Sequence, residues 1–415
     1  MWSLLKVFVY EHLSGGGAAN HHPPLSSLSD GFGMLSSLLR NLRKAGYFTT
    51  TTLDGRIASL RPPLEADKVA PASTREETVS LVKELAEEAD YSYVIAPEAG
   101  GTLEELVELT GKLDTSLNCK PREIARAADK LSLLKNAKEI GLEVPETVAV
   151  SLGDMEDGRK VAKEMSYPLI VKPSEGVGCS GLSVVTEEEE LVAAFRKVDK
   201  LSSAKQLLIQ RIVRGVPVSI SLISTGKRAL LLALNSQDIL FSTPDSDSEY
   251  LGGAMPYHHP LRRRALEAAK RLVESTKLTG YVGVDLVLTR RGPVIMEVNP
   301  RLTTSFVGLS MVLQPNIAQL IVDAVVRGKL PDSVEINGCA LVSKLLVEGV
   351  SQKKLQKAYD MEALVSPPFP IGADYGYALL AVCACRAKEA RLRALESEKQ
   401  LLRLFPSRPL SARTP

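Results

Sequence analysis

The chain of 415 residues carries 51 basic side chains against 49 acidic ones, so its formal net charge is only +2. This balance gives no electrostatic reason to expect a nucleic acid or an anionic membrane as a partner. Hydrophobic residues make up 45% and charged residues 24%, as is ordinary for a soluble globular protein of about two to three domains. No apolar run reaches the roughly 18 residues of a membrane span. The five cysteines lack metal-type spacing, and the expected location is the cytoplasm, where thiols stay reduced.

The first third of the chain alternates strand-like and helix-like runs, which predicts a small open α/β domain over residues 1–120. Its opening strand leads into three glycines, Gly15-Gly16-Gly17. One predicted helix begins with Thr74 and Glu77 at the spacing of a capping box. The predicted strands are Leu4–Tyr10 and Tyr91–Ala96, and the predicted helices are Met34–Lys44, Thr74–Asp90 and Leu103–Thr110.

A block with mixed strand and helix patterns follows over residues 121–330, and we expect an α+β domain there. Pro121 is expected to open one helix that carries Lys130 and ends near Gly141, because proline is tolerated at the first helical position. Residues 331–415 are predicted to form a small strand-rich segment that ends in a charged helix at Ala387–Leu404.

Two carboxylates and an amide are expected to converge late in this block. The segments around Asp285 and Glu297 read as strands joined by the turn Arg290-Arg291-Gly292, which predicts an antiparallel hairpin. Asp285 and Glu297 would then face each other, and Asn299 would share the face of Glu297. Oxygen ligands of this kind suit Mg²⁺, which usually takes one or two carboxylates plus substrate phosphates. The alternative is a pair of acids at a strand edge that binds the turn arginines, and spacing alone does not decide between them.

A glycine-rich turn follows a strand that ends in lysine, in the segment Lys172-Pro173-Ser174-Glu175-Gly176-Val177-Gly178-Cys179-Ser180-Gly181. Lysine supplies a point charge for phosphate oxygens, and glycines let backbone amides approach an anion closely. An ordinary hairpin loop with a solvated lysine is the alternative. Further on, Gln210-Arg211-Ile212-Val213 links two strands and either presents backbone groups to an adenine edge or is a simple crossover.

The order of these features resembles the ATP-grasp superfamily, and Glu297-Val298-Asn299-Pro300-Arg301 is the most specific segment. The resemblance covers roughly residues 1–330. It implies an ATP-grasp fold with an N-terminal pre-ATP-grasp domain, in which ATP lies between two α+β subdomains.

The resemblance also implies a role for each residue. ATP would be bound by Lys130, Lys172, Gly176, Gly178, Ser180, Gln210, Arg211, Ile212 and Val213. Mg²⁺, or Mn²⁺ in its place, would be held by Asp285, Glu297 and Asn299, and Arg301 and Lys172 would be catalytic. One departure concerns the ribose, because Arg211 and the segment Gly215-Val216-Pro217-Val218-Ser219 stand where many family members carry an acid.

In a narrower direction, several segments are similar to the tyramine–glutamate ligases of methanofuran biosynthesis. These segments are 7–17, 52–56, 95–98, 250–253 and 301–305. The similarity implies that ATP phosphorylates a carboxylate, here the γ-carboxylate of glutamate, and that tyramine or a similar amine then displaces phosphate. Glu11, Asp54, Arg56 and Glu98 would help to bind the amine or amino acid, since strand ends of an open sheet face a cleft; otherwise they are plain polar surface residues.

Other readings stay open at this point. The chain is an ATP-grasp ligase or carboxylase with another substrate, or a nucleotide-binding regulatory module without turnover. A dinucleotide-binding protein is disfavoured because the G-x-G-x-x-G pattern is absent. The expected partners are a small-molecule carboxylate and an amine, with neither nucleic acid nor membrane, and a homodimer is left open.

Overall fold

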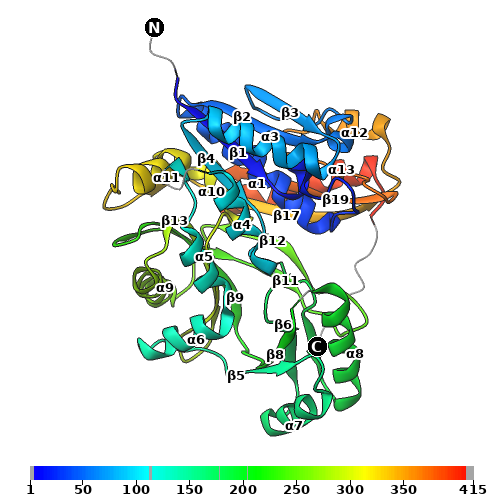
Figure 1. Ribbon diagram of the computed structural model, residues 1–415, viewed down its shortest axis with the longest axis vertical. Coiled ribbons are helices and arrows are strands. Elements are labelled where there is room, and N and C mark those ends of the chain that lie inside the picture. The colour runs from blue at the N-terminus through cyan, green and yellow to red at the C-terminus, as the bar shows by residue number, and fades with distance from the viewer. Residues whose placement is uncertain (1–3, 112–114, 177, 203, 408–415) are drawn as a thin grey trace.

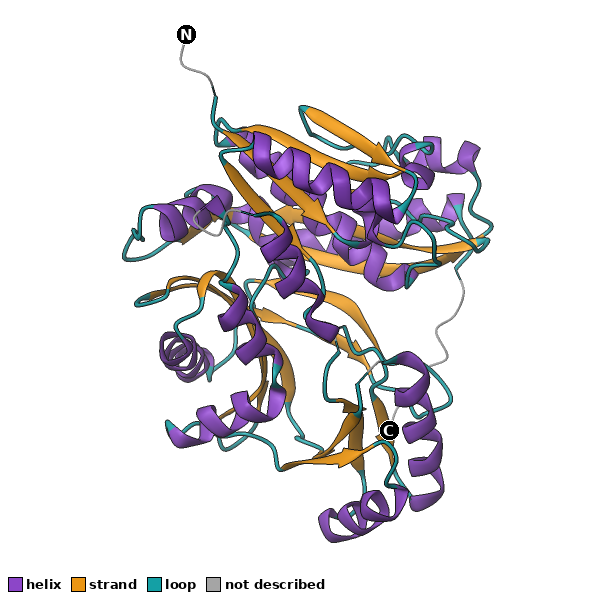
Figure 2. Cartoon of the chain, viewed as in Figure 1, coloured by secondary structure: helices purple, strands orange, loops and turns teal. Residues whose placement is uncertain are grey.

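The computed structural model describes residues 4–111, 115–176, 178–202 and 204–407 of the chain. Figure 1 shows an upper lobe, where N-terminal and C-terminal segments lie together, above two lobes built from the middle of the chain. Helices and strands are mixed in all three lobes (Figure 2), as expected for the fold class. Within the described residues, no helix combines the length and apolar character needed to cross a membrane.

The N-terminal part of the upper lobe is a parallel sheet flanked by helices. Its elements are β1 (Lys6–Glu11), η1 (Leu13–Gly17), α1 (Leu25–Lys44), β2 (Phe48–Asp54), α2 (Gly55–Ala58), β3 (Lys68–Ala72), α3 (Arg75–Glu88), β4 (Tyr91–Ile95), η2 (Ala99–Gly101) and α4 (Thr102–Leu109). The strand order is β3-β2-β1-β4. Val7 and Val9 pack on the side of α1, whereas Phe8 and Tyr10 pack on the side of α3. The strand β1 is therefore apolar on both faces, as parallel sheets require.

The single helix predicted after Pro121 is wrong, because the structure has two helices, α5 (Pro121–Ala128) and α6 (Lys130–Glu139). Asp129 separates them with an extended backbone (φ −72°, ψ 91°). Its carboxylate accepts hydrogen bonds from the Ser132 amide at 3.1 Å and from the Ser132 hydroxyl at 2.6 Å. Asp129 is thus the N-cap of α6, and the break places Lys130 at the first residue of that helix.

The first middle lobe is an antiparallel sheet covered by two helices on one face. It consists of β5 (Thr147–Ser151), α7 (Met155–Met165), β6 (Leu169–Pro173), β7 (Ser183–Val185), α8 (Glu188–Leu201) and β8 (Gln206–Arg211), in the strand order β5-β8-β6-β7. Val171 and Ile209 pack with the residues of α7 and α8. Since successive strand residues point to opposite faces, Lys172 and Gln210 face away from these helices.

The second middle lobe repeats this plan with a longer sheet. Its elements are β9 (Val216–Thr225), β10 (Ala229–Ser236), α9 (Arg262–Thr276), β13 (Thr279–Leu288), β14 (Pro293–Asn299), α10 (Ser305–Val312) and α11 (Ile317–Val326), and the strand order is β10-β9-β13-β14. Val284 and Leu286 of β13 pack with the α9 residues Ala269 and Leu272. Asp285 lies between them in sequence, so it points to the opposite face of the sheet.

The C-terminal residues share a sheet with the middle of the chain. That sheet contains β11 (Asp238–Leu240), β12 (Glu249–Met255), β17 (Cys339–Glu348), β18 (Leu364–Ser366) and β19 (Tyr375–Ala384), in the order β11-β12-β17-β19-β18; β15 (Leu313–Gln314), β16 (Glu335–Ile336), α12 (Gln352–Ala358) and α13 (Ala387–Leu404) complete the chain. Gly33 of α1 packs so tightly on Leu379 of β19 that an added Cβ would lie 2.5 Å from its side chain. The C-terminal segment is therefore strand-rich, as expected, and joins the upper lobe around α1.

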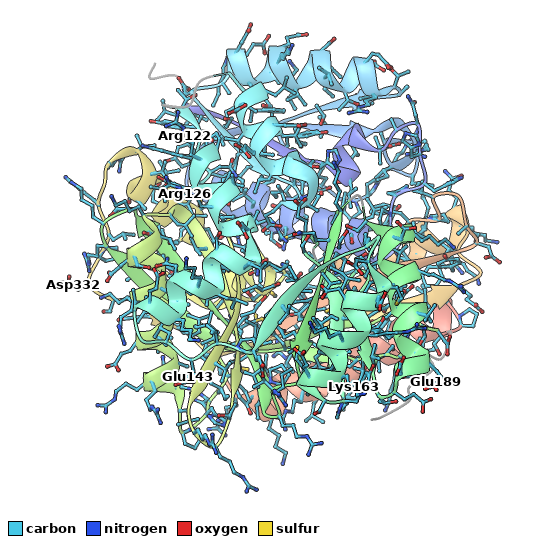
Figure 3. All side chains as sticks on the ribbon, turned by 60° about the horizontal axis from the view of Figure 1, so that its bottom comes forward. Arg122, Arg126, Glu143, Lys163, Glu189 and Asp332 are labelled. Carbon is cyan, nitrogen blue, oxygen red and sulfur yellow. The ribbon has the colours of Figure 1, made fainter. Side chains whose placement is uncertain are left out.

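The outer surface carries both signs of charge. In the view of Figure 3, the labelled and exposed side chains are Arg122, Arg126 and Lys163, which are basic, and Glu143, Glu189 and Asp332, which are acidic. This mixture agrees with the balanced composition of the chain.

Candidate functional site

A cavity of about 940 Å³ opens where the two middle lobes meet the upper lobe. Its walls include all the residues that the sequence assigned to ATP, Mg²⁺ or catalysis: Lys130, Lys172, Gly176, Gly178, Ser180, Gln210, Arg211, Ile212, Val213, Asp285, Glu297, Asn299 and Arg301. These residues come from α6, β6, β8, β13, β14 and the loops that follow the strands. The fold therefore gathers into one cavity side chains that lie up to 171 positions apart, from Lys130 to Arg301.

The acidic hairpin forms as expected, with Asp285 of β13 directly opposite Glu297 of β14. Asn299 Nδ2 donates to Asp285 Oδ2 at 3.0 Å, and Gln237 Nε2 donates to Asp285 Oδ1 at 2.9 Å. Lys130 Nζ donates to Glu297 Oε2 at 2.8 Å. Among the described residues the acids pair with these groups and not with the turn arginines.

The two carboxylates have opposite titration behaviour because their neighbours differ. Burial and the charge of Glu297 raise the pKa of Asp285. Burial would also raise the pKa of Glu297, but the Lys130 and Lys172 ammonium groups outweigh it and lower that pKa. Two adjacent buried carboxylates resist joint ionisation, so a bound cation between them would be stabilised by both.

Two lysines approach the acidic hairpin from different elements. Lys172 is 9% exposed, and burial lowers its pKa to about 8, with the Lys130 charge adding to this effect and Glu297 opposing it. Burial alone would lower the pKa of Lys130, but Glu297 outweighs it and raises that pKa. Lys130 therefore stays charged near neutral pH, whereas Lys172 titrates close to the physiological range.

The glycine-rich loop lies over the lysines. The Gly176 carbonyl accepts from Lys130 Nζ at 3.3 Å, and Gly178, Cys179 and Gly181 all have positive φ (60°, 67° and 71°). At Gly181 an added Cβ would lie 2.9 Å from the Pro173 ring, so the tight turn requires glycine. Successive residues with left-handed backbone bring amide groups toward one side, which suits the cradling of an anion. Val177 lies outside the described residues.

The linker segment forms the wall of the cavity at the end of β8. Gln210 is buried and its Nε2 donates to Thr147 Oγ1 at 2.8 Å. Arg211 turns outward and pairs with Glu146, Nε to Oε2 at 2.9 Å, and both side chains are half exposed. The backbone of the linker and the apolar side chains of Ile212 and Val213 therefore line this wall.

Arg301 and Glu98 form a buried ion pair between two domains of the chain. Arg301 Nε lies 3.0 Å from Glu98 Oε2, a short ion-pair distance without the alignment of a hydrogen bond. The two side chains are 12% and 8% exposed. Burial would lower the pKa of Arg301, but the Glu98 carboxylate raises it. Glu98 itself is not part of the cavity wall, so it acts on the site through Arg301.

The other three N-terminal candidates do not line the cavity and bind protein groups. Asp54 caps α2 and pairs with Arg56, whose guanidinium also donates to the Ala18 and His21 carbonyls. Glu11 is 2% exposed and accepts hydrogen bonds from the Ser14 amide and hydroxyl. Burial raises the pKa of Glu11 to about 7, against these hydrogen bonds. In this structure all three residues hold the loop between β1 and α1.

Several lining residues were given no individual role by the sequence. Gln237 contacts Asp285 from outside any strand, and Ser219 of β9 lies beside it. Thr303 and Thr304 lead into α10, where hydroxyl groups of Thr303 and Ser305 lie 2.8 Å apart. Such polar residues become recognisable only when the sheet and the helix are assembled.

Comparison with protein families gives two matches. A pre-ATP-grasp domain family matches residues 47–124, and an ATP-grasp domain family matches residues 127–305. Over 241 residues the chain is 24% identical to the carbamoyl phosphate synthase large chain of Pyrococcus furiosus; this stretch is 57% of the chain. The chain spans only about a fifth of that relative, 22% of its length.

Solved structures agree on the fold over nearly the whole chain. A biotin carboxylase–β,γ-ATP complex from Campylobacter jejuni superposes with a TM-score of 0.72 at 15% identity, covering 97% of this chain and 92% of that one. The biotin carboxylase domain dimer of the Hydrogenobacter thermophilus 2-oxoglutarate carboxylase, solved with MgADP and bicarbonate, gives 0.70 at 16%, covering 98% and 91%. The chain therefore contains two domains of the ATP-grasp superfamily, a pre-ATP-grasp domain followed by an ATP-grasp domain, and adopts the ATP-grasp fold.

Proposed function

We propose that the protein is an ATP- and Mg²⁺-dependent ligase that forms an amide bond through an acyl phosphate. The observation that carries this proposal is the convergence in one cavity of two lysines, one arginine and the Asp285–Glu297 pair. Such a charge distribution suits a polyphosphate with its cation, because phosphoryl transfer depends on positioning and on neutralisation of charge.

The residues present fit a magnesium ion. Among the described residues no three His, Cys, Asp or Glu side chains cluster as a metal site. A cation would therefore rely on Asp285, Glu297 and Asn299 together with phosphate oxygens, which is the usual coordination of Mg²⁺ in such sites. When bound, the ion would neutralise phosphate charge. The amide of Gln237 already holds Asp285 in place from one side.

The protein residues have distinct tasks in the proposed reaction. A substrate carboxylate oxygen attacks the γ-phosphorus of ATP, the bond to the β-phosphate oxygen breaks, and ADP leaves. An amine then attacks the acyl carbon, loses a proton and expels phosphate. Lys130 and Lys172 would hold the phosphates, and Arg301 would steady the transferred group. The loop over the site would keep water away from the acyl phosphate.

We further propose glutamate as the carboxylate substrate, through its γ-carboxylate, and tyramine or a similar amine as the nucleophile. The support is the similarity of five segments of the chain to tyramine–glutamate ligases of methanofuran biosynthesis. The homologous relative and the solved structures bear other names, so this identification rests on those segments alone.

A carboxylase is the second candidate function. The whole-chain likeness to biotin carboxylases, one of them solved with bicarbonate, favours it. In that case bicarbonate would replace the carboxylate substrate. A regulatory module without turnover is the third reading, and any substrate-dependent release of ADP contradicts it.

A screen of ADP release over carboxylates and amines tests the proposal. Glutamate plus tyramine should stimulate release, and glutamate plus hydroxylamine should yield a hydroxamate that reports the acyl phosphate. Stimulation by bicarbonate without any carboxylate would identify a carboxylase. Turnover on another carboxylate–amine pair, with none on glutamate and tyramine, would reject the specific substrates and keep the reaction class.

A further inference from the structure

A second group of polar side chains lines the cavity where the upper lobe closes it. Asp30 of α1 and Tyr250 of β12 both line the wall, although neither belongs to the acidic hairpin, the glycine loop or the linker. α1 lies in the N-terminal part of the upper lobe, and β12 pairs with the C-terminal strand β17. This end of the cavity is thus built from segments outside the phosphate site.

A buried lysine stands behind these two residues and already has its partners. Lys344 Nζ of β17 donates to Asp30 Oδ2 at 2.7 Å and to Ser26 Oγ at 2.9 Å. The nitrogen also lies 5.8 Å from the centre of the Tyr250 ring and 6.0 Å from that of Tyr377. The Lys344 side chain is only 2% exposed. Its charge is therefore neutralised by Asp30 and shared with two aromatic faces.

The surroundings of Tyr250 keep an excess of negative charge. Burial raises the pKa of Tyr250 well above its usual range, and the charges of Asp30, Asp238 and Asp285 add to this effect. The neighbouring Glu249 accepts a hydrogen bond from the Tyr377 hydroxyl through Oε1. Within the described residues, the buried Glu249 Oε2 and Asp30 Oδ1 have no hydrogen-bond partner. Asp30 and Glu249 thus each keep one carboxylate oxygen without a hydrogen bond.

The shape and charge of this wall favour a cationic ligand group. Three features stabilise a bound ammonium group: an aromatic face, carboxylates held in a region of low dielectric, and a hydrogen-bond acceptor whose lone pairs are not already used. Tyr250 and Asp30 supply these features on one wall. An anionic group at the same place would be repelled by the carboxylates, and a neutral group would gain nothing from their charge.

We propose that Asp30 and Tyr250 bind a substrate ammonium group and thereby determine which substrate the enzyme accepts. This inference rests on the proposed ligase function. The ammonium is either that of the amine substrate before it loses its proton, or the α-ammonium of an amino acid whose side-chain carboxylate is activated. Lys344 is a positioning residue that orients Asp30 from behind.

The test compares steady-state kinetics of the full-length protein and the Asp30→Asn variant, with glutamate and tyramine varied in turn at saturating MgATP. We expect KM for one of these substrates to rise by about 10- to 100-fold, which corresponds to the loss of a charge-assisted hydrogen bond, while KM for ATP rises by less than about twofold. Replacing glutamate by glutarate, which lacks the ammonium, distinguishes the sources. If the ammonium belongs to glutamate, the penalty disappears with glutarate; if it belongs to tyramine, KM for tyramine rises with either acid.

Two further variants separate recognition from a structural role. Ser26→Ala removes the uncharged partner of Lys344 and should leave every KM near that of the wild type. Asp30→Asn/Lys344→Met removes the ion pair without leaving a buried charge, and the KM penalty should persist in it. Recovery of the wild-type KM in the double variant, or no KM change in Asp30→Asn, would overturn the proposal.

Failure of the proposed ligase function can be distinguished from failure of the ammonium site in the ADP-release assay. In the first case the wild type would release no ADP with any carboxylate. Calorimetric titration of tyramine and of glutamate into wild type and Asp30→Asn makes the same comparison without turnover. Binding that is weakened by the substitution supports ammonium recognition, and affinities that are equal or absent in both proteins reject it.

Discussion

Replacing Glu297 by glutamine removes one charge from the acidic pair while keeping the size of the side chain. In the structure Glu297 accepts from Lys130 Nζ at 2.8 Å and opposes the burial that lowers the pKa of Lys172 to about 8. The variant would lose a proposed Mg²⁺ ligand and leave two ammonium groups with less compensating charge. We expect kcat for ADP release to fall at least about 10²- to 10³-fold, on the order of 3–4 kcal/mol, as when one preorganised electrostatic group is removed.

The pH profile gives a second, independent consequence. In its proposed role Lys172 must be protonated to neutralise phosphate, so kcat/KM for ATP should fall in the wild type as pH rises through about 8. Glu297 raises this pKa, and its removal lowers it further. Glu297 is the largest charge acting on Lys172, and one such charge in an effective dielectric of about 20 is worth on the order of 1 kcal/mol, or roughly one pH unit. The alkaline limb should therefore move to lower pH by about that amount.

A coupled assay of ADP release between pH 6 and pH 9.5 measures both effects. Glu143→Gln is a matched control, because Glu143 (labelled in Figure 3) is exposed and does not line the cavity. Thermal unfolding should confirm that both variants are folded. Wild-type kcat in Glu297→Gln, or superimposable pH profiles, would refute the role assigned to Glu297.

Three further predictions concern buried charge and the N-terminal loop. Lys172→Met should abolish ADP release yet stabilise the fold below pH 8, because lowering the Lys172 pKa from 10.5 to about 8 costs the folded state about 3 kcal/mol. This gain in stability should shrink as pH rises toward 10.5. Urea unfolding at several pH values measures it. Burial raises the pKa of Glu11 from 4.5 to about 7, so the folded protein binds a proton there that the unfolded chain has already lost. The free energy of unfolding of the wild type should therefore fall, relative to that of Glu11→Gln, as pH rises from about 4.5 to about 7. An equal pH dependence of the two proteins would contradict the burial argument. Arg56→Met should lower the melting temperature by a few degrees, since it removes a partly exposed pair with Asp54 and two carbonyl contacts, and a raised KM for either substrate would instead favour a substrate role for Arg56.

The local sequence predicted those parts of the site that depend on neighbours along the chain. Asp285 faces Glu297 because a short turn joins two strands and the side-chain period of a strand is two. The glycine loop after Lys172 follows from the same local rules. Strands β2 and β3 were missed because Thr49 to Thr52 and the Pro71 segment lack an apolar alternation, although β2 is buried in the sheet. The break between α5 and α6 was missed because an aspartate such as Asp129 occurs both at helix N-caps and inside helices, so its identity does not mark a helix end.

Only the tertiary structure decided which distant charges meet. Arg301 pairs with Glu98 from another domain, and Lys344 pairs with Asp30 across 314 positions. No spacing rule connects such residues, since their approach depends on how sheets and helices pack and on the apolar surface that this packing buries. The sequence by itself therefore determined the chemistry of the proposed ATP and Mg²⁺ site, in the order of its lysines, glycines and acids. The packing of α1 on the sheet of β12 and β17 determined the far wall of the cavity, because long-range burial, and not local propensity, brings Asp30, Tyr250 and Lys344 together.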